Sequence, residues 1–282
     1  MNNTLRLIDG NNLFRRLFEK LGPVAMPTLY QESISNLPTQ TIAWVWDGRN
    51  SKARRRAIFP DYKEGRAPAS DEFYRSREFF KELLGHSNCL NIECEGWEAD
   101  DVIATMAKGF EGDVLINSND ADFLTLTSKP NIRVLHEKEF DVPAEDMRLF
   151  KALVGDQSDN IKGIKGYGVS KFKKLTALEK NLFIDALEGK RDPEEVAEAL
   201  ALTPAVKANW IENIETIRKG WQIIELYDVP LDELGAGIKV GQLNPTAAQQ
   251  RLAALYIPTE PMPGADVVAR LRAEQAMMNH AM

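Results

Sequence analysis

The sequence predicts an α/β protein with a central, mostly parallel sheet flanked by helices, followed by a helical region. Three apolar runs are typical of buried strands, and each ends in acids or leads directly into them: Leu5 to Asp9, Thr41 to Asp47 and Asp113 to Asn117. Helical patterns separate these runs. Strands that alternate with helices form parallel sheets, whose sites lie beyond the carboxyl ends of the strands. We therefore expect the acids after these strands to share one site.

The other elements are predicted from apolar periodicity, capping residues and turn residues. Helices are expected over residues 13–21, 28–36, 70–84, 143–155, 203–219 and 221–227. A hairpin at the sheet edge is expected from residues 131–136 and 139–142. Three prolines from Pro258 to Pro263 predict a stiff linker to a last amphipathic segment over 265–278. The domain prediction is therefore a core over 1–148, a helical region over 149–257, and a linker with a terminal helix over 258–282.

The composition is that of a globular protein, with 44% hydrophobic and 27% charged residues. No apolar run reaches about 18 residues, and the first strand leaves no room for a signal peptide, so no membrane association and a cytoplasmic location are expected. Cys89 and Cys94 lie five apart in a predicted strand and so point to opposite faces, which disfavours a disulfide. The three histidines lack ligand spacing relative to these cysteines, which disfavours zinc.

The net charge of −7 by itself argues against a nucleic-acid partner, but the basic residues are concentrated in two segments. Seven basic residues and two acids lie between Arg49 and Arg66, and five lysines without an acid lie between Asn160 and Thr176. The first segment lacks apolar periodicity, and we expect it to project over the site, where its charge suits a phosphate backbone. A solvated basic loop is the alternative.

Glu98, Asp100 and Asp101 place three carboxylates within four positions at the start of a helical pattern. Crowded carboxylates repel one another unless a cation compensates them, which favours a divalent-metal site. The alternative is an acidic first turn that interacts with the helix dipole. Further along, Asp156 and Asp159 precede a turn with glycines at 163, 166 and 168 and then lysines. Such a turn can hold phosphate through backbone N–H groups without reading bases.

Six ordered motifs between residues 5 and 180 carry a resemblance to a known family. They are Ile8-Asp9-Gly10-Asn11, Trp46-Asp47-Gly48, Tyr62-Lys63-Glu64-Gly65-Arg66, Glu98-Ala99-Asp100-Asp101, Asn119-Asp120-Ala121-Asp122-Phe123 and Gly155-Asp156-Gln157-Ser158-Asp159-Asn160. The chain resembles the 5′-nuclease family of flap endonucleases and 5′-to-3′ exonucleases, found in bacteriophages and in the N-terminal domain of bacterial DNA polymerase I. The resemblance implies a PIN-like fold, a helix-three-turn-helix DNA-binding region over about 149–177, and a basic arch over about 49–84.

The resemblance also implies roles for individual residues. Ligand or supporting roles at divalent metals fall to Asp9, Asp47, Glu98, Asp100, Asp101, Asp120, Asp122, Asp156 and Asp159. Lys63 and Arg66 match a basic pair that positions and neutralises the scissile phosphate. Predicted DNA contacts are Arg54, Arg55, Arg56, Tyr62, Lys151, Lys162, Lys165, Gly166, Gly168, Lys171, Lys173 and Lys174. Carbonyls near Leu153, Val154, Lys162, Ile164 and Tyr167 match a potassium site.

The resulting hypothesis is a 5′ nuclease that hydrolyses DNA at or near 5′ ends, nicks and flaps with two or more Mg²⁺ or Mn²⁺ ions, in DNA replication and repair. Two metals supply an activated water, a Lewis acid and stabilisation of the leaving oxygen, and hard oxygen ligands favour Mg²⁺ or Mn²⁺ over zinc. The alternatives are a ribonuclease acting on RNA–DNA hybrids and a DNA-structure-binding protein without catalysis. The sequence indicates no protein partner, and a viral source would place the protein in the host cytoplasm.

Overall fold

A six-stranded sheet with the order β5-β4-β1-β2-β3-β6 forms the centre of the computed structural model, which describes residues 4–36, 39–137 and 141–255. The strands are β1 (Thr4–Asp9), β2 (Thr41–Asp47), β3 (Leu90–Cys94), β4 (Asp113–Asn117), β5 (Ile132–Leu135) and β6 (Ile238–Val240). Strands β1 to β5 run parallel, and β6 pairs antiparallel with β3. The predicted mostly parallel sheet is therefore confirmed.

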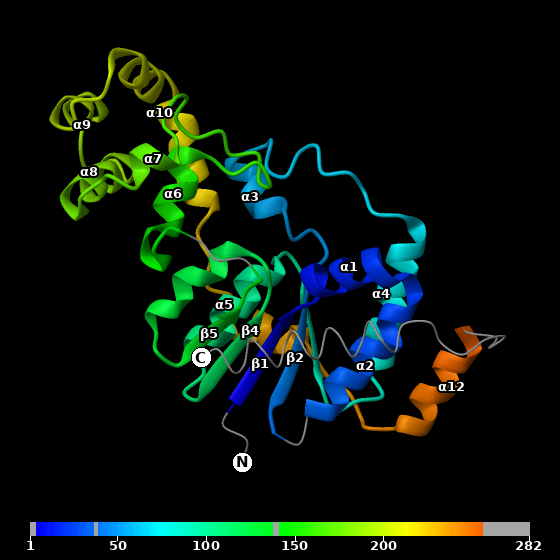
Figure 1. Ribbon diagram of the computed structural model, residues 1–282. Helices are drawn as coiled ribbons and strands as arrows, with labels where there is room; N and C mark the ends of the chain where they lie inside the picture. Colours follow the sequence, from blue (N-terminus) through cyan, green and yellow to red (C-terminus); the bar gives the residue numbers. More distant parts are fainter. Residues whose placement is uncertain (1–3, 37–38, 138–140, 256–282) are drawn as a thin grey trace.

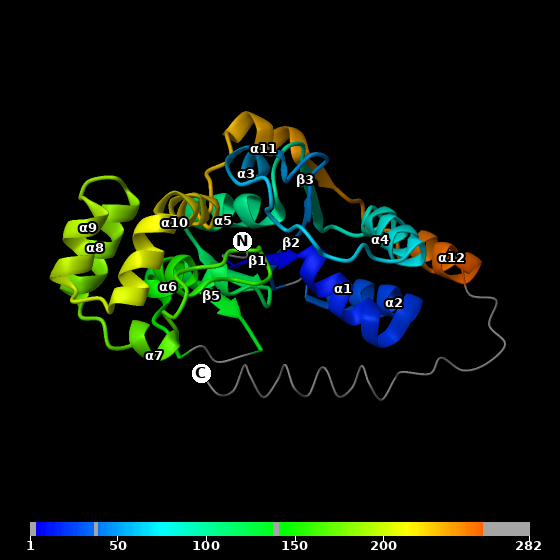
Figure 2. The same cartoon turned by 90° about the horizontal axis from the view of Figure 1, so that it is seen from above.

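Helices cover both faces of this sheet (Figures 1 and 2). On one face lie α1 (Gly10–Leu21), α2 (Ala25–Asn36) and α4 (Asp71–Leu84), where Phe14, Leu29 and Phe80 pack against Trp44 and Trp46 of β2. The other face is covered by α5 (Ala99–Gly109) and the 3-10 helix η2 (Ala121–Ser128). Because both faces are covered, the central strands are mostly apolar instead of alternating with polar residues, and the one charged residue in the middle of β1, Arg6, is buried and paired with Glu32.

A second apolar core belongs to the helical region, which lies beyond the carboxyl ends of the strands (Figure 1). Its helices are α6 (Met147–Val154), α7 (Val169–Phe172), α8 (Ala177–Leu187), α9 (Pro193–Ala199) and α10 (Pro204–Ile223). Phe183 and Trp210 meet edge to face inside it, with ring centroids 5.3 Å apart. The helical region thus places the glycine turn next to the edge of the sheet where the acids gather.

The remaining short elements connect these layers. They are η1 (Gly22–Val24), α3 (Ala53–Ile58), η3 (Ala144–Asp146), α11 (Leu231–Gly237) and α12 (Pro245–Leu255). Helix α3 lies inside the basic segment that lacks apolar periodicity, and the chain from α3 to α4 crosses above the carboxyl ends of the strands (Figure 1). Within the described residues, no helix is both long and apolar enough to span a membrane.

One sequence prediction about elements needs correction, and one element was missed. Strand β5 pairs in parallel with β4, and the second strand of the expected hairpin lies partly outside the described residues, so the hairpin stays a prediction. The helices expected over 203–219 and 221–227 are one helix to Ile223, since Gly220 stays helical and packs against Ile161. Strand β6 was not predicted. Residues 138–140 of the expected hairpin and the whole linker and terminal segment over 258–282 lie outside the described residues.

Candidate active site

Asp9 lies at the centre of the acidic site because β1 is the strand between β4 and β2. Its carboxylate is buried and accepts hydrogen bonds from the Asn12 backbone N–H at 3.0 Å and from the Ser118 hydroxyl at 2.7 Å. Burial, with the nearby charges of Asp47 and Asp120, raises the pKa of Asp9 to about 7. The surroundings of Asp9 therefore do not supply enough positive charge to stabilise its ionised form.

The end of β2 is joined to the start of α5 through Asp47. The Asp47 carboxylate accepts a hydrogen bond from the Ala99 backbone N–H at 2.9 Å, which brings Glu98 and Asp100 of α5 to the same edge as Asp9. Burial raises the pKa of Asp47, and the charge of Glu98 raises it further. Burial and the charge of Asp120 likewise raise the pKa of Asp100. The structure thus brings together acids from β1, β2, α5 and the loop after β4.

Glu98 differs from these acids because protein cations surround it. Its carboxylate accepts hydrogen bonds from Arg55 and Lys63, each at 2.8 Å, and from the Tyr62 hydroxyl at 3.1 Å. Burial opposes ionisation, but the charges of Lys63 and Arg55 outweigh it and hold the pKa of Glu98 below its usual value. Glu98 is therefore a fixed anion that holds Lys63 at the edge of the site.

Arg55 and Asp101 form a buried pair next to this network. Both Asp101 oxygens accept from the Arg55 guanidinium, at 2.7 and 2.8 Å, and Oδ1 also accepts from the Tyr227 backbone N–H at 2.9 Å. The Arg55 guanidinium also donates hydrogen bonds to the backbone carbonyls of Ile223 and Glu225. Arg55 was predicted as a DNA contact, and the structure corrects this because its guanidinium is used inside the protein. Asp101 was predicted to be a ligand or a supporting residue at a metal, and its contacts with Arg55 and Tyr227 leave it the supporting role.

Two further predicted DNA contacts are also buried. Tyr62 is 2% exposed, and its hydroxyl group donates to Glu98. Lys151 is 9% exposed, and its ammonium group lies 2.5 Å from Asp122 Oδ1, 2.9 Å from Asp156 Oδ2 and 3.7 Å from Asp120 Oδ1. A side chain held in this way is not available to a DNA backbone, so both predictions are corrected.

The charges around Lys151 change the pKa values of its neighbours in opposite directions. Burial opposes the charge on Lys151, but Asp122, Asp120 and Asp156 outweigh it and raise the pKa of the lysine. Burial also opposes ionisation of Asp156, but Lys151 holds the pKa of this acid below its usual value. Asp122 keeps a pKa of about 7 because burial and the charge of Asp120 exceed the effect of the lysine.

The arch is tied to the helical region through Asp159. Arg66 donates to the Ser158 carbonyl and to Asp159 Oδ1, both at 3.0 Å, and Lys63 Nζ lies 4.0 Å from the same oxygen. Burial raises the pKa of Asp159, while Lys63 lowers it. The Arg66 side chain is 46% exposed. Lys63 and Arg66, the two residues predicted to position a phosphate, therefore lie together at the rim of the acidic site.

The glycine turn is packed closely against the end of α6. Gly163 has a φ of +63°, and a Cβ added there would lie 2.6 Å from the Leu153 carbonyl oxygen, so only glycine fits without strain. The Leu153 carbonyl accepts from the Ile164 N–H, and the Ile164 carbonyl accepts from the Tyr167 N–H. Each of these carbonyls has a second lone pair, so the potassium prediction, which also includes Val154 and Lys162, stays a prediction.

Most of the other predicted DNA contacts are exposed on the glycine turn, on α7 and on α3. They are Lys162, Lys165, Gly166, Gly168, Lys171, Lys173, Lys174, Arg54 and Arg56. The Arg54 guanidinium stacks 3.8 Å from the centre of the Trp97 ring, and Lys173 pairs with Asp141. Of the lysines that follow the glycines, only Lys171 lies within a helix, the four-residue α7. These groups form a basic surface beside the acids.

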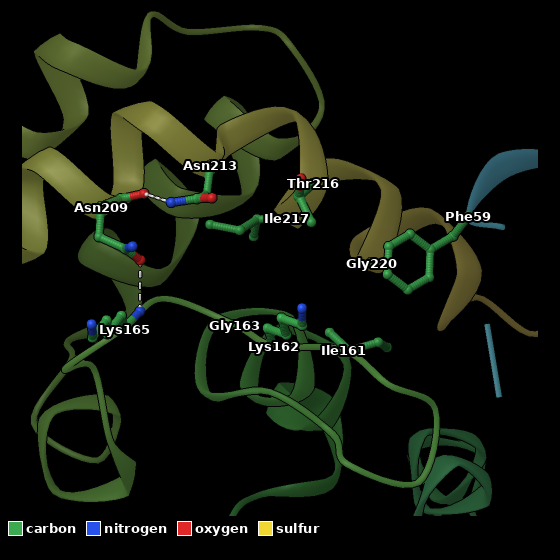
Figure 3. Close-up of a pocket in the computed structure, with 10 residues that line it drawn as sticks. All are labelled: Phe59, Ile161, Lys162, Gly163, Lys165, Asn209, Asn213, Thr216, Ile217 and Gly220. Carbon is green, nitrogen blue, oxygen red and sulfur yellow. Dashed lines mark hydrogen bonds between the residues drawn. The ribbon is translucent and has the colours of Figure 1, made fainter. Parts of the chain in front are cut away.

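A cavity of about 340 Å³ lies between the glycine turn and α10 (Figure 3). Asn209 of α10 closes one end, where its side-chain oxygen accepts from the Lys165 backbone N–H at 2.7 Å. Phe59, from the chain between α3 and α4, contributes the other end. The hydrogen bond between Asn209 and Lys165 connects α10 to the glycine turn across this cavity. Lys162 and Lys165 line the cavity on the side of the turn.

The acids are spaced by lysines. Among the described residues, no three acidic side chains lie close enough together to coordinate one metal ion. Lys63 and Lys151 explain this spacing, since each ammonium lies between acids that would otherwise approach one another. Asp9, Asp47 and Asp100 form no ion pair with a described residue. Their oxygens are therefore the donors that best fit an added divalent cation.

Sequence reasoning missed two roles in the site. Ser118 supports Asp9 and also accepts a hydrogen bond from the Asp120 backbone N–H at 3.1 Å, which orients the loop after β4. The signal was present, because a serine two residues before an acid is typical of a local side-chain turn. The internal role of Lys151 has no local signal, since its partners are distant in sequence.

The mostly parallel sheet, with acids at its carboxyl edge and a basic turn beside them, defines a PIN-like α/β protein of the nuclease class. The family model described as 5′-3′ exonuclease, N-terminal resolvase-like domain, matches residues 4–152. A 5′-3′ exonuclease of Mycoplasmopsis pulmonis is 32% identical over 208 residues, which cover 64% of this chain and 69% of that protein. The chain therefore belongs to the 5′-3′ exonuclease family.

Longer relatives share this region of sequence, and solved structures share its fold. DNA polymerase I of Thermus aquaticus is 28% identical over 252 residues, covering 80% of this chain but 29% of the polymerase. The chain spans 24% of the DNA polymerase I of Caldicellulosiruptor bescii. A structure of T5 5′-exonuclease with bound zinc has a TM-score of 0.60 at 19% identity, over 96% of this chain and 97% of that chain. A bacteriophage T5 flap endonuclease complex with DNA and metal ions has a TM-score of 0.55 at the same identity and coverage, and both show the fold.

Proposed function

We propose that this chain is a metal-dependent 5′-to-3′ exonuclease and flap endonuclease that hydrolyses DNA phosphodiesters at or near 5′ ends. One observation carries the proposal. Asp9, which is buried, and Asp47 and Asp100, which are half-buried, have raised pKa values and form no ion pair with a described residue, and they lie near Lys63 at the carboxyl edge of the sheet. Such a group of acids needs added positive charge, and divalent ions supply it.

The proposed ligands are the predicted acids without Asp101. They are Asp9, Asp47, Glu98, Asp100, Asp120, Asp122, Asp156 and Asp159, acting directly or through water. Carboxylate oxygens favour Mg²⁺ or Mn²⁺, and two or more ions are proposed. Bound there, the ions supply Lewis-acid stabilisation and an activated water for phosphodiester hydrolysis. Asp101 supports the start of α5 through its pair with Arg55.

Lys63 and Arg66 are proposed to hold the scissile phosphate. Lys63 is held by Glu98 at 2.8 Å and lies 4.0 Å from Asp159, so its remaining N–H donors are free to reach an incoming phosphate oxygen. Arg66 uses one edge of its guanidinium on Ser158 and Asp159 and is half-exposed. Fixed donors at this rim stabilise negative charge that develops on the phosphate without having to reorganise.

The glycine turn is proposed to hold the DNA backbone. Its exposed lysines surround Gly166 and Gly168, whose backbone approaches the surface without side chains. The T5 relative named above has been solved with DNA and metal ions, which supports a DNA partner here. One apolar cluster lies mainly in the helical region and two lie on the faces of the sheet, which supports a division between a nuclease core over 1–148 and a helical region that begins at 149. After that region the chain returns to the sheet, where β6 pairs with β3. A potassium ion at the turn, cytoplasmic action and roles in replication and repair remain parts of this proposal.

The test is product mapping on a 5′-labelled flap duplex with Mg²⁺. Asp120→Asn is expected to lower the rate roughly 10- to 100-fold, the scale of losses at metal-supporting residues. Asp113→Asn is the matched control, because Asp113 is exposed at the opposite end of β4. Wild-type protein that releases nothing with Mg²⁺, or an Asp120→Asn variant that keeps full activity, would overturn the proposal. A faster reaction on an RNA–DNA hybrid would favour the ribonuclease instead.

A further inference from the structure

Lys151 is a cation inside the proposed ligand set. Its ammonium group lies between Asp122 and Asp156, at 2.5 and 2.9 Å, with Asp120 at 3.7 Å, and its side chain is 11% exposed. Asp122 follows β4 of the sheet, whereas Asp156 follows α6 of the helical region. The lysine thus joins acids from the two parts of the chain, at the position where an ion shared by these two acids would lie.

An ammonium group and a divalent ion exclude each other at such a position. Mg²⁺ bound to carboxylate oxygens lies about 2.1 Å from them. The ammonium already occupies the space between Asp122 and Asp156, and its positive charge repels a second cation there. An ion can therefore enter between these two acids only when the lysine moves away.

The acids on the other side of the site lack such a competitor. Asp9, Asp47 and Asp100 form no ion pair with a described residue. Lys63 acts on the charge of Asp47 and Asp100 and Lys52 on that of Asp47, but neither lysine reaches ion-pair distance of these acids, and Lys63 is held by Glu98. Divalent ions therefore meet unequal competition at the two sides. The protein itself compensates the Asp122 and Asp156 side, whereas the Asp9 side depends on added cations.

We propose that Lys151 is a built-in counter-ion that weakens binding of a second divalent ion at Asp122 and Asp156. This inference rests on the proposed function. It makes the two ions unequal: one binds tightly near Asp9, and the second binds weakly because it must displace an ammonium group. Lys151 is then a positioning residue that controls metal occupancy, in addition to joining the core to the helical region.

Direct metal titration tests the inference without measuring catalysis. Mn²⁺ is added to the metal-free full chain, and free Mn²⁺ is followed by electron paramagnetic resonance. Wild type is expected to show one tight and one weak binding step, and Lys151→Met is expected to tighten the weak step by about tenfold or more, because a positive charge next to the ion is removed. Lys151→Arg keeps the charge and is expected to behave like wild type.

The matched control is Lys207→Met, which removes the same charge from a partly exposed lysine paired with Glu198 on the helical region, away from the acids. It is expected to leave both binding steps unchanged. The inference would be overturned if Lys151→Met bound both Mn²⁺ ions with the same affinities as wild type, or bound the second ion more weakly. If wild type binds no Mn²⁺ at all, the proposed function fails first, and the inference fails with it.

A second measurement covers the case in which Lys151→Met folds poorly without metal. Thermal unfolding is followed by circular dichroism from EDTA to increasing Mn²⁺. The variant is expected to be less stable than wild type in EDTA, because Asp122 and Asp156 lose their shared counter-ion, and to gain more stability from Mn²⁺ than wild type does. A variant that gains no more than wild type would overturn the inference, whatever its starting stability.

Discussion

Replacement of Arg55 by methionine tests how strongly the arch is fixed to the acidic site. Arg55 is 3% exposed, and its guanidinium donates five hydrogen bonds, to Asp101, Glu98 and the carbonyls of Ile223 and Glu225. Methionine fills much of the same volume but leaves two buried carboxylates and two carbonyls without these donors. The perturbation is therefore a loss of charge and hydrogen bonds at nearly constant packing.

The expected loss of stability follows from the burial of the pair. Removing one partner of a buried ion pair costs about 3 to 5 kcal/mol because the other charge stays buried and unpaired. Asp101 keeps only the Tyr227 N–H as a described hydrogen-bond donor, so we expect the upper part of that range. A domain of this size loses about 2 to 4 °C of melting temperature per kcal/mol, which makes the expected shift on the order of 10 °C.

Urea unfolding at pH 7.5, with thermal unfolding beside it, measures this effect. Arg56→Met is the matched control, because Arg56 is the exposed neighbour on the same helix and makes one long hydrogen bond, at 3.4 Å, to the Tyr62 carbonyl. Combining Arg55→Met with Asp101→Leu is expected to recover part of the loss, because the unpaired charge is removed as well. If Arg55→Met costs no more than Arg56→Met, the buried network does not hold the arch and the reasoning is refuted.

Three further predictions concern pH, the glycine turn and the rim of the site. In EDTA the free energy of unfolding is expected to fall as pH rises from about 5 to 7, because the pKa of Asp9 is 3.8 unfolded and about 7 folded, so the folded state keeps a proton that the unfolded chain releases. The full shift is worth on the order of 4 kcal/mol, and urea unfolding of Asp9→Asn, expected to flatten the slope, checks it. Gly163→Ala is expected to lower the melting temperature more than Gly189→Ala. Both glycines have positive φ, but an added Cβ meets backbone atoms only at Gly163, so equal losses would contradict the steric argument. Lys63→Met is expected to lower single-turnover cleavage on the order of 100-fold while binding of flap DNA in Ca²⁺ changes little, and equal losses in both assays would indicate simple backbone binding.

The sheet and its acids were predictable because their signals are local. A buried parallel strand is apolar along its length, and the carboxyl ends of neighbouring parallel strands meet at one edge, so Asp9 and Asp47 could be placed together from the sequence. Strand β6 could not be found in this way. It is three residues long, and its partner β3 lies more than a hundred positions earlier in the chain. Pairing of that kind depends on how the helical region returns to the sheet.

The direction of each charged side chain was the main feature that the sequence could not supply. Arg54, Arg55 and Arg56 are consecutive, but α3 turns successive residues by about 100°, so the three point in different directions. Only Arg55 points to α5 and becomes buried, whereas Arg54 lies over Trp97 and Arg56 is exposed. A run of basic residues indicates total charge, and the helix decides which of them meets solvent.

The division of the basic residues into buried and exposed ones explains how an acidic protein could carry both the proposed metal site and the proposed DNA surface. Arg55, Lys63 and Lys151 come from basic segments or from the helix before the glycine turn, yet all three compensate acids inside the site. The basic residues left for DNA are the exposed ones on the glycine turn, α7 and α3. Each phosphate that a basic residue neutralises adds to the salt dependence of DNA binding. We therefore expect this salt dependence to reflect the number of exposed basic residues and to be smaller than the total number of basic residues implies.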